Sequence, residues 1–328
     1  MALLSLFLSC LLLVASSNGE RKQVPDGVQP LSEEIVNFIN SINTTWRAGP
    51  NFKPTFNLEN IHSLFGVKAK PHKLKVKRPE TNIDLPKSFD ARDQWPTCRS
   101  LREVRDQSNC GSCWAFATAE AITDRICIAS GGVFQQDISA QDLMTCCTEC
   151  GNGCHGGEPL TAWQYWVDHG LVTGGLYNGT GCEPYTIPPH HHGEPYRDTP
   201  VCTHKCINPH DDYDESKWYG RSAYLLDSEQ AIKQDIFTHG SVGADFTVYA
   251  DFPSYKSGVY QAHSKEAFGG HAIKLIGWGE ENGVPYWLGV NSWNTEWGDK
   301  GYFKFLRGSN ECGIESDVVA GILRWGSE

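Results

Sequence analysis

The chain has 328 residues, enough for one large or two modest globular units with a buried core. Its 28 Lys and Arg against 39 Asp and Glu give a net charge of −11, which argues against nucleic acid as a partner because phosphate binding requires a basic surface. A hydrophobic share of 40% and a charged share of 20% exclude a disordered chain, and 13 cysteines indicate an oxidising, secretory route.

The N-terminus begins with an apolar run from Ala2 to Ala15, followed by Ser16 and Ser17. This run is too short to span a bilayer, which takes about 20 residues. We therefore predict that residues 1–17 are a cleaved signal peptide, with a signal anchor as the alternative. No other stretch reaches membrane length, so we expect no membrane-bound mature protein.

Charge divides the rest of the chain. Residues 18–84 hold 10 Lys/Arg and 7 Asp/Glu and no Cys, whereas residues 85–328 hold 18 and 32. The first segment contains an expected amphipathic helix, Leu31–Asn40, with Ser32 as its N-cap, and then an extended, protease-sensitive strip from Lys68 to Pro79. A cationic segment ahead of an anionic body favours a removable, inhibitory pro-segment; the alternative is an ordinary N-terminal subdomain.

The body shows helical and then β patterns. Residues 113–170 are mainly helical, with a second helix expected over Glu158–Asp168. Residues 174–220 have little periodicity and are expected to be held by disulfides. A further helix begins after Ser228 and ends at Gly240. Four strands are predicted after it: Val242–Tyr249, His271–Trp278, Pro285–Val290 and Tyr302–Leu306.

Five residues form a candidate nucleophile constellation. Cys113 falls where the first long helix begins, and the positive end of the helix dipole would favour its thiolate. A nucleophilic Cys needs a base, which His271 could supply, and Asn291 could orient that imidazole behind the shield of Trp293. Gln107 could donate its side-chain amide to an oxyanion. Taken singly, Cys113 could be a half-cystine and His271 a buried structural histidine.

The motif Cys110-Gly-Ser-Cys-Trp114 resembles the signature of the papain family. The wording of several other segments is similar to that of the cathepsin B-like branch: Asp90-Ala-Arg-Asp-Gln-Trp-Pro96, Leu143-Met-Thr-Cys-Cys147, Ser292-Trp-Asn-Thr295 and Cys312-Gly-Ile-Glu-Ser316. The resemblance covers about residues 30–323. It implies an α+β, papain-like fold with a helical L half, a β-barrel R half and the active site in the cleft between them.

The resemblance implies a cysteine endopeptidase that needs no metal or cofactor. Its expected partners are polypeptide substrates, its own pro-segment as inhibitor and cystatin-like protein inhibitors. The expected location is the secretory pathway, ending in the lysosome or outside the cell, for example in a gut lumen. The alternative is a catalytically inactive homologue that acts as a binder.

The resemblance also implies five disulfides, which leave Cys113 free and Cys312 as a buried, inert thiol. The implied pairs are Cys98–Cys127, Cys110–Cys154, Cys146–Cys202, Cys147–Cys150 and Cys182–Cys206. The alternative for the cluster between Cys146 and Cys154 is a zinc site, which an oxidising compartment disfavours.

Specificity elements follow from the same resemblance. Gly156 and Gly157 would let substrate backbone lie close, and Asp317 would accept a basic side chain at P2, the second residue before the cleaved bond. Asp317 is one methylene shorter than the family's Glu, so we expect it to contribute less to the binding of an arginine at P2.

The occluding-loop region departs most from the family pattern. It keeps a histidine triplet, His190, His191 and His192, but has lost its own disulfide. We expect the triplet to bind a substrate's terminal carboxylate, with a metal site or a solvated tract as alternatives. Asn43 and Asn178 lie in glycosylation sequons.

Overall fold

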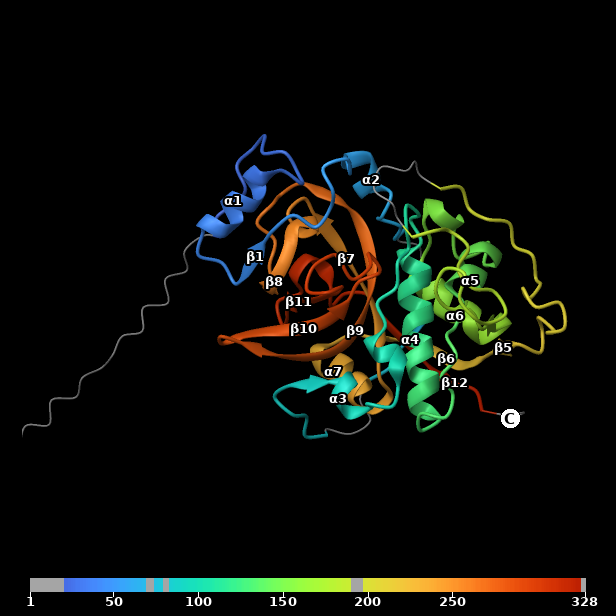
Figure 1. Ribbon diagram of the computed structural model, residues 1–328. Helices are drawn as coiled ribbons and strands as arrows, with labels where there is room; N and C mark the ends of the chain where they lie inside the picture. Colours follow the sequence, from blue (N-terminus) through green and yellow to red (C-terminus); the bar gives the residue numbers. More distant parts are fainter. Residues whose placement is uncertain (1–20, 69–73, 79–82, 190–196, 326–328) are drawn as a thin grey trace, which may run out of the picture.

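The computed structural model describes residues 21–68, 74–78, 83–189 and 197–325, and Figure 1 shows a helical half beside a half built on a sheet. The elements are, in chain order, α1 (Glu33–Ser41), β1 (Trp46–Ala48), α2 (Leu58–His62), β2 (Lys75–Val76), β3 (Phe89–Asp90), α3 (Ala91–Gln94), η1 (Arg99–Arg102), α4 (Cys113–Ala129), α5 (Ala140–Cys146), η2 (Gly153–His155), α6 (Pro159–His169), β4 (Leu171–Val172), β5 (Lys217–Trp218), β6 (Gly220–Leu226), α7 (Glu229–His239), β7 (Val242–Tyr249), η3 (Phe252–Ser254), β8 (Tyr255–Tyr260), β9 (Ala267–Glu281), β10 (Val284–Val290), β11 (Tyr302–Leu306), η4 (Glu311–Gly313) and β12 (Val318–Leu323).

The helical half packs α5 and α6 against the long helix α4 (Figure 1). Its core is aromatic and aliphatic, with Trp114, Leu143, Trp163 and Trp166 all fully buried. Such large side chains contribute most of the apolar area that stabilises a core. The helix expected to begin at Cys113 is confirmed, so this half presents the first residue of α4 toward the sheet.

The sheet half has the strand order β1-β8-β11-β10-β9-β7-β12-β6-β2. Most neighbours are antiparallel, whereas β11 with β8 and β2 with β6 are parallel. The two outermost strands both come from the first 84 residues of the chain. The two-part α+β architecture implied by the resemblance is confirmed.

Local signals explain where the predicted helices begin and end. Ser32 caps α1 by accepting a hydrogen bond from the Ile35 N–H. Glu158 caps α6 through its carboxylate, and Gly170 ends that helix with a φ of 71°. Ser228 and Gly240 begin and end α7 in the same way. These helices are confirmed to within one or two residues.

Strand β9 is longer than the predicted His271–Trp278 segment. It begins at Ala267 because β7 pairs with the glycines ahead of His271, opposing Thr247 to Gly270 and Val248 to Gly269. Glycine is a poor strand former, so this extension depends on pairing with a distant strand and has no local sequence signal.

Buried charges join the two halves. Lys274 of β9 lies 2.9 Å from Asp124 of α4, and Arg125 of α4 pairs with Asp235 of α7; all four side chains are buried. Breaking one partner of such a pair leaves an uncompensated buried charge. These contacts fix α4 against the sheet, and with it Cys113.

The structure forms the five disulfides implied by the resemblance. Two of them hold the long stretch that follows Val172, whose described residues contain neither helix nor strand before Lys217. The remaining cysteines are Cys113, which is buried, and Cys312. Cys312 was expected to be buried and is half-buried; burial and Glu311 raise its pKa and keep it a neutral thiol. No helix in the described part is both long and apolar enough to cross a membrane.

Candidate active site

Cys113 is the first residue of α4 and is completely buried. Its Sγ accepts a hydrogen bond from the Gly66 N–H at 3.3 Å. Burial raises the pKa of the Cys113 thiol to about 11, and the N–H groups of Ala272, Gly66 and Trp114 only partly oppose this. In this covered form burial outweighs the effect of the helix start, because residues 64–68 exclude water from it; the thiolate of the uncovered enzyme stays a prediction.

His271 lies in β9 and is held by Asn291, which follows β10. The imidazole Nε2 is 2.8 Å from Oδ1 of Asn291. An amide oxygen can only accept, so Nε2 carries the proton and Nδ1 is free to take one. Trp293 lies against the imidazole with ring centroids 4.6 Å apart. Burial lowers the pKa of His271 to about 4, although the bond to Asn291 opposes the change.

Gln107 has both ends of its side-chain amide engaged. Its Oε1 accepts from Ser292 Oγ at 2.7 Å, which fixes the orientation of the amide. Its Nε2 donates to the carbonyl of Cys110 at 2.8 Å and to that of Leu64 at 3.0 Å. A peptide carbonyl from the N-terminal segment thus occupies the place expected for an oxyanion.

Residues 66–68 cross the site in extended form between the two halves. Gly157 N donates to Gly66 O, Lys68 N to Gly157 O, and Val67 N to Gly270 O, at 2.8, 2.8 and 3.1 Å. Val67 is parallel to Gly157 and antiparallel to Gly270. The two halves therefore clasp the segment through backbone hydrogen bonds on both sides.

Glycines permit this close approach. A Cβ on Gly157 would lie 2.5 Å from the Trp114 ring, and one on Gly66 would lie 1.9 Å from the Gly111 carbonyl. Gly156 has a φ of 100°, which favours glycine. The expected role of Gly156 and Gly157 in holding an extended peptide fits this geometry.

Asp317 is exposed and immediately precedes β12. Sequence reasoning missed the residue beside it, Asp245 of β7, whose signal was a single acid in the apolar segment Val242–Tyr249. Burial, together with the negative charges of Asp317 and Glu158, raises the pKa of Asp245 to about 8. At and below neutral pH the carboxyl of Asp245 is therefore largely protonated, and the site contains an ionisable acid that the sequence analysis did not identify.

Two other sets of predicted residues lie apart from these contacts. His190, His191 and His192 fall outside the described residues. The sequon asparagines Asn43 and Asn178 are both exposed.

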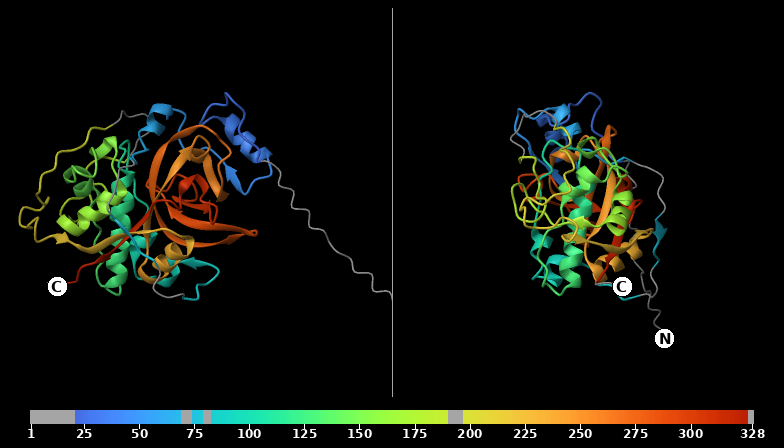
Figure 2. Two further views of the ribbon diagram at one scale, coloured as in Figure 1. Left: turned by 180° about the vertical axis from the view of Figure 1, so that it is seen from behind. Right: turned by 90° about the vertical axis from the view of Figure 1, so that its right-hand side faces the viewer.

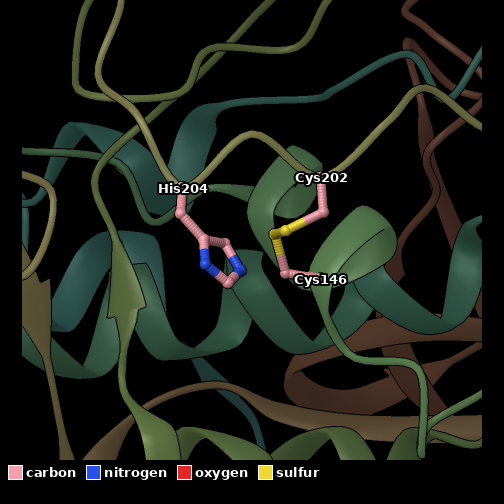
Figure 3. Close-up of side chains that lie close together, drawn as sticks. All are labelled: Cys146, Cys202 and His204. Atoms are coloured by element: carbon pink, nitrogen blue, oxygen red, sulfur yellow. A yellow bond between two sulfur atoms is a disulfide. The ribbon is translucent and has the colours of Figure 1, made fainter.

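Cys146, Cys202 and His204 lie close together, as Figure 3 shows. The two sulfurs form a disulfide, and a disulfide supplies no thiolate for a metal. Cys147, Cys150 and Cys154 are also in disulfides, so the alternative of a zinc site is wrong.

The model of the papain family cysteine proteases matches residues 85–322, and the model of the peptidase family C1 propeptide matches residues 31–71. The chain therefore belongs to the papain family of cysteine proteases, with a propeptide ahead of the peptidase domain.

Within that family its relatives are cathepsin B-like. The chain is similar to cathepsin B-like cysteine proteinase 6 of Caenorhabditis elegans, at 43% identity over 98% of this chain and 94% of the relative. It is 44% identical to the cathepsin B-like cysteine proteinase of Schistosoma japonicum, over 90% and 92%. Among solved structures, proCathepsin B S9 from Trypanosoma congolense matches with a TM-score of 0.81 and 38% identity, covering 90% of this chain and 99% of that one.

Proposed function

We propose that residues 85–328 form an endopeptidase in which Cys113 is the nucleophile. Its sulfur attacks the peptide carbonyl, His271 gives a proton to the leaving amine as the C–N bond breaks, and an acyl-enzyme remains. His271 then takes a proton from water, which attacks the thioester and releases Cys113. Asn291 orients the imidazole, and Gln107 stabilises the oxyanion.

One observation supports these roles above all. The carbonyl of Leu64 accepts from Gln107 Nε2 while the Gly66 N–H contacts the Cys113 sulfur. A polypeptide backbone thus already lies against the proposed oxyanion donor and nucleophile. In this covered site burial keeps Cys113 a neutral thiol and His271 a neutral imidazole.

We propose that residues 18–84 are an inhibitory pro-segment and residues 1–17 a signal peptide. Removal of the pro-segment would admit water to Cys113 and His271, reverse the shifts of both pKa values and allow a thiolate–imidazolium pair to form. The proposed location is the lysosome or an extracellular lumen, where cystatin-like inhibitors would compete for the same cleft.

The test is covalent labelling with an epoxide thiol reagent. The processed enzyme should take up one equivalent, the Cys113→Ala variant none, and the unprocessed chain much less than the processed one. Cys312 serves as the internal control, because its neutral thiol should stay unlabelled in every sample. Absence of uptake by the processed wild type would favour the alternative of an inactive binder.

We further propose that cleavage within chains is strong and that removal of C-terminal dipeptides is weakened. His190, His191 and His192 retain the cationic group that can bind a terminal carboxylate below a pKa of about 6.5. Without its own disulfide, the segment loses more conformational freedom when it closes over the cleft.

This activity balance is tested with a free-acid peptide and its amide. The processed enzyme should prefer the free acid modestly, and replacement of all three histidines by alanine should abolish the preference. A strong preference that survives the triple replacement would contradict the role of the histidines.

A further inference from the structure

Strand β7 carries Asp245 on the face of the sheet that packs against α4. Asp245 lies directly opposite Ala272 of β9. Directly paired residues of antiparallel strands point to the same face. Ala272 packs with Cys113 and Ala117 of α4, so Asp245 shares its face with the proposed nucleophile.

The neighbouring strand places a second acid beside it. Strand β12 is antiparallel to β7, with Val318 opposite Ala244 and Val319 opposite Gly243. Continuing this register by one residue sets Asp317 opposite Asp245. A row therefore runs from Ala272 of β9 through Asp245 of β7 to Asp317, which immediately precedes β12, and leads outward from the buried Cys113.

The charge of Asp245 has no cationic partner. Within the described ranges, no hydrogen bond or ion pair engages its carboxylate. Its electrostatic neighbours Asp317 and Glu158 are also acids. Two buried acids of this chain do have a cation, since Asp124 pairs with Lys274 and Asp235 with Arg125. Like charges that lie close together without a counterion are unfavourable. The described part of the chain supplies no cation to this row, so a cation from a bound ligand would stabilise it.

The pro-segment does not supply that cation either. Its residue beside the row is Val67, which packs against Cys113, Ala117 and Ala272. The basic residue that follows, Lys68, donates its backbone N–H to Gly157, and its Cε lies near Gly156. In this covered form the apolar side chain of Val67 therefore lies at the end of the row nearest to Cys113.

We infer that Asp245 is a specificity-determining residue, which together with Asp317 forms a two-carboxylate subsite for an arginine side chain at P2 of the substrate. This inference rests on the proposed function, which makes Cys113 the nucleophile. The planar guanidinium has five donors in a fixed fork and can serve two carboxylates at once, whereas an ammonium is a single point of charge. Asp245 would thereby offset the short reach of Asp317, so arginine is favoured more than Asp317 alone predicts.

The experiment compares two peptide substrates that differ only in Arg or Phe at P2. The processed wild type is compared with Asp245→Asn, Asp317→Asn and a matched control, Asp93→Asn, which removes the same charge from an exposed position in α3. Active enzyme is counted by epoxide titration. Asp245→Asn should lower the Arg/Phe ratio of kcat/KM at least tenfold, mainly through KM, and more than Asp317→Asn does.

Two other outcomes of this experiment would contradict the inference. A ratio that changes no more in Asp245→Asn than in Asp93→Asn, while the Phe substrate is still cleaved, overturns the inference and leaves the proposed function standing. Absence of epoxide uptake by the processed wild type would contradict the proposed function and the inference with it.

The pH dependence of the wild type tests the same inference without requiring that a variant folds. Ionisation of the acid row should make the Arg/Phe ratio rise between pH 5 and 8. Asp317, Glu158 and Cys113 are the titratable groups that interact with Asp245, and the ratio removes the contributions of Cys113 and His271, which both substrates share. A ratio that stays flat across this range would also overturn the inference.

Discussion

At the scale of single residues, the side-chain amide of Gln107 is fixed in one orientation. Ser292 fixes its oxygen, and its nitrogen is directed at a peptide carbonyl of the pro-segment. A donor that is already oriented costs no reorganisation when negative charge develops on a substrate oxygen.

We expect Gln107→Ala to lower kcat by about a hundredfold, with a much smaller change in KM, because the donor is most valuable in the transition state. Steady-state kinetics of the epoxide-titrated variant would measure this. Ser292→Ala, which frees the amide without removing it, should have a smaller effect. A reduction of less than threefold in Gln107→Ala would contradict the assignment to the oxyanion.

The residues of the candidate site could be selected from sequence, but their charge states in the covered form could not. Cys113, His271, Asn291 and Gln107 stand in short motifs whose chemistry can be recognised locally. The neutral thiol of Cys113 depends instead on cover by Gly66, 47 positions earlier in the chain. The surroundings of Asp245 depend on strand pairing, to which no local pattern points.

At the scale of elements, the pro-segment is held by backbone more than by side chains. Residues 66–68 form three backbone hydrogen bonds to the two halves. The closest approach is at Gly66, where only a hydrogen atom fits beside Gly111. The inhibitory contact is therefore sensitive to side-chain volume at this one position.

We expect Gly66→Val to dislodge the segment, because its first side-chain carbon would lie 1.9 Å from a backbone oxygen. The unprocessed variant should then react with the epoxide at a rate close to that of the processed enzyme. A control is Lys53→Val, which places the same side chain at an exposed position of the same segment. An unprocessed Gly66→Val chain that stays as unreactive as the wild type would contradict this account.

Helices were predicted better than short strands for a physical reason. The caps Ser32, Glu158 and Ser228 act within three residues of their helix. Strands β1 and β2 have only three and two residues and exist because β8 and β6 offer free edges to them. Such pairing links residues about 150 to 210 positions apart, which no local pattern of hydrophobicity reveals.

At the scale of the whole molecule, inhibition is linked to protons. Burial in the docked form lowers the pKa of His271 to about 4, so that docking which buries the imidazole favours its neutral form. Docking is then strongest above the ordinary value of about 6.5 and weakens as the pH falls from there toward 4. Asp245 acts in the opposite direction, because its raised pKa favours the protonated acid in the docked state.

We expect the affinity of residues 18–84 for a Cys113→Ala body to fall by up to about a hundredfold between pH 6.5 and 4, since each pKa unit corresponds to about tenfold. Binding of the purified segment at several pH values measures this. The double variant Cys113→Ala/His271→Ala isolates the histidine and should show a flatter profile. Identical profiles for the two bodies would exclude His271 as the linked group.

The ion pair between Lys77 and Asp235 should persist in acid. Burial alone would raise the pKa of Asp235, but Arg125 and Lys77 outweigh it and hold that pKa below its ordinary value. The stability from this pair is therefore lost only at pH values below about 4. The pro-segment accordingly has an acid-resistant anchor on α7 and a proton-sensitive contact at the active site.

The two strands of the pro-segment occupy both ends of the sheet, β1 beside β8 and β2 beside β6. In the uncleaved chain they cap the hydrogen-bonding edges of both of these strands. Maturation would therefore do more than unblock the cleft: it would leave two bare rows of backbone donors and acceptors, to which strands from other molecules can add. While β1 and β2 stay in place, both edges of the sheet are closed to edge-to-edge association.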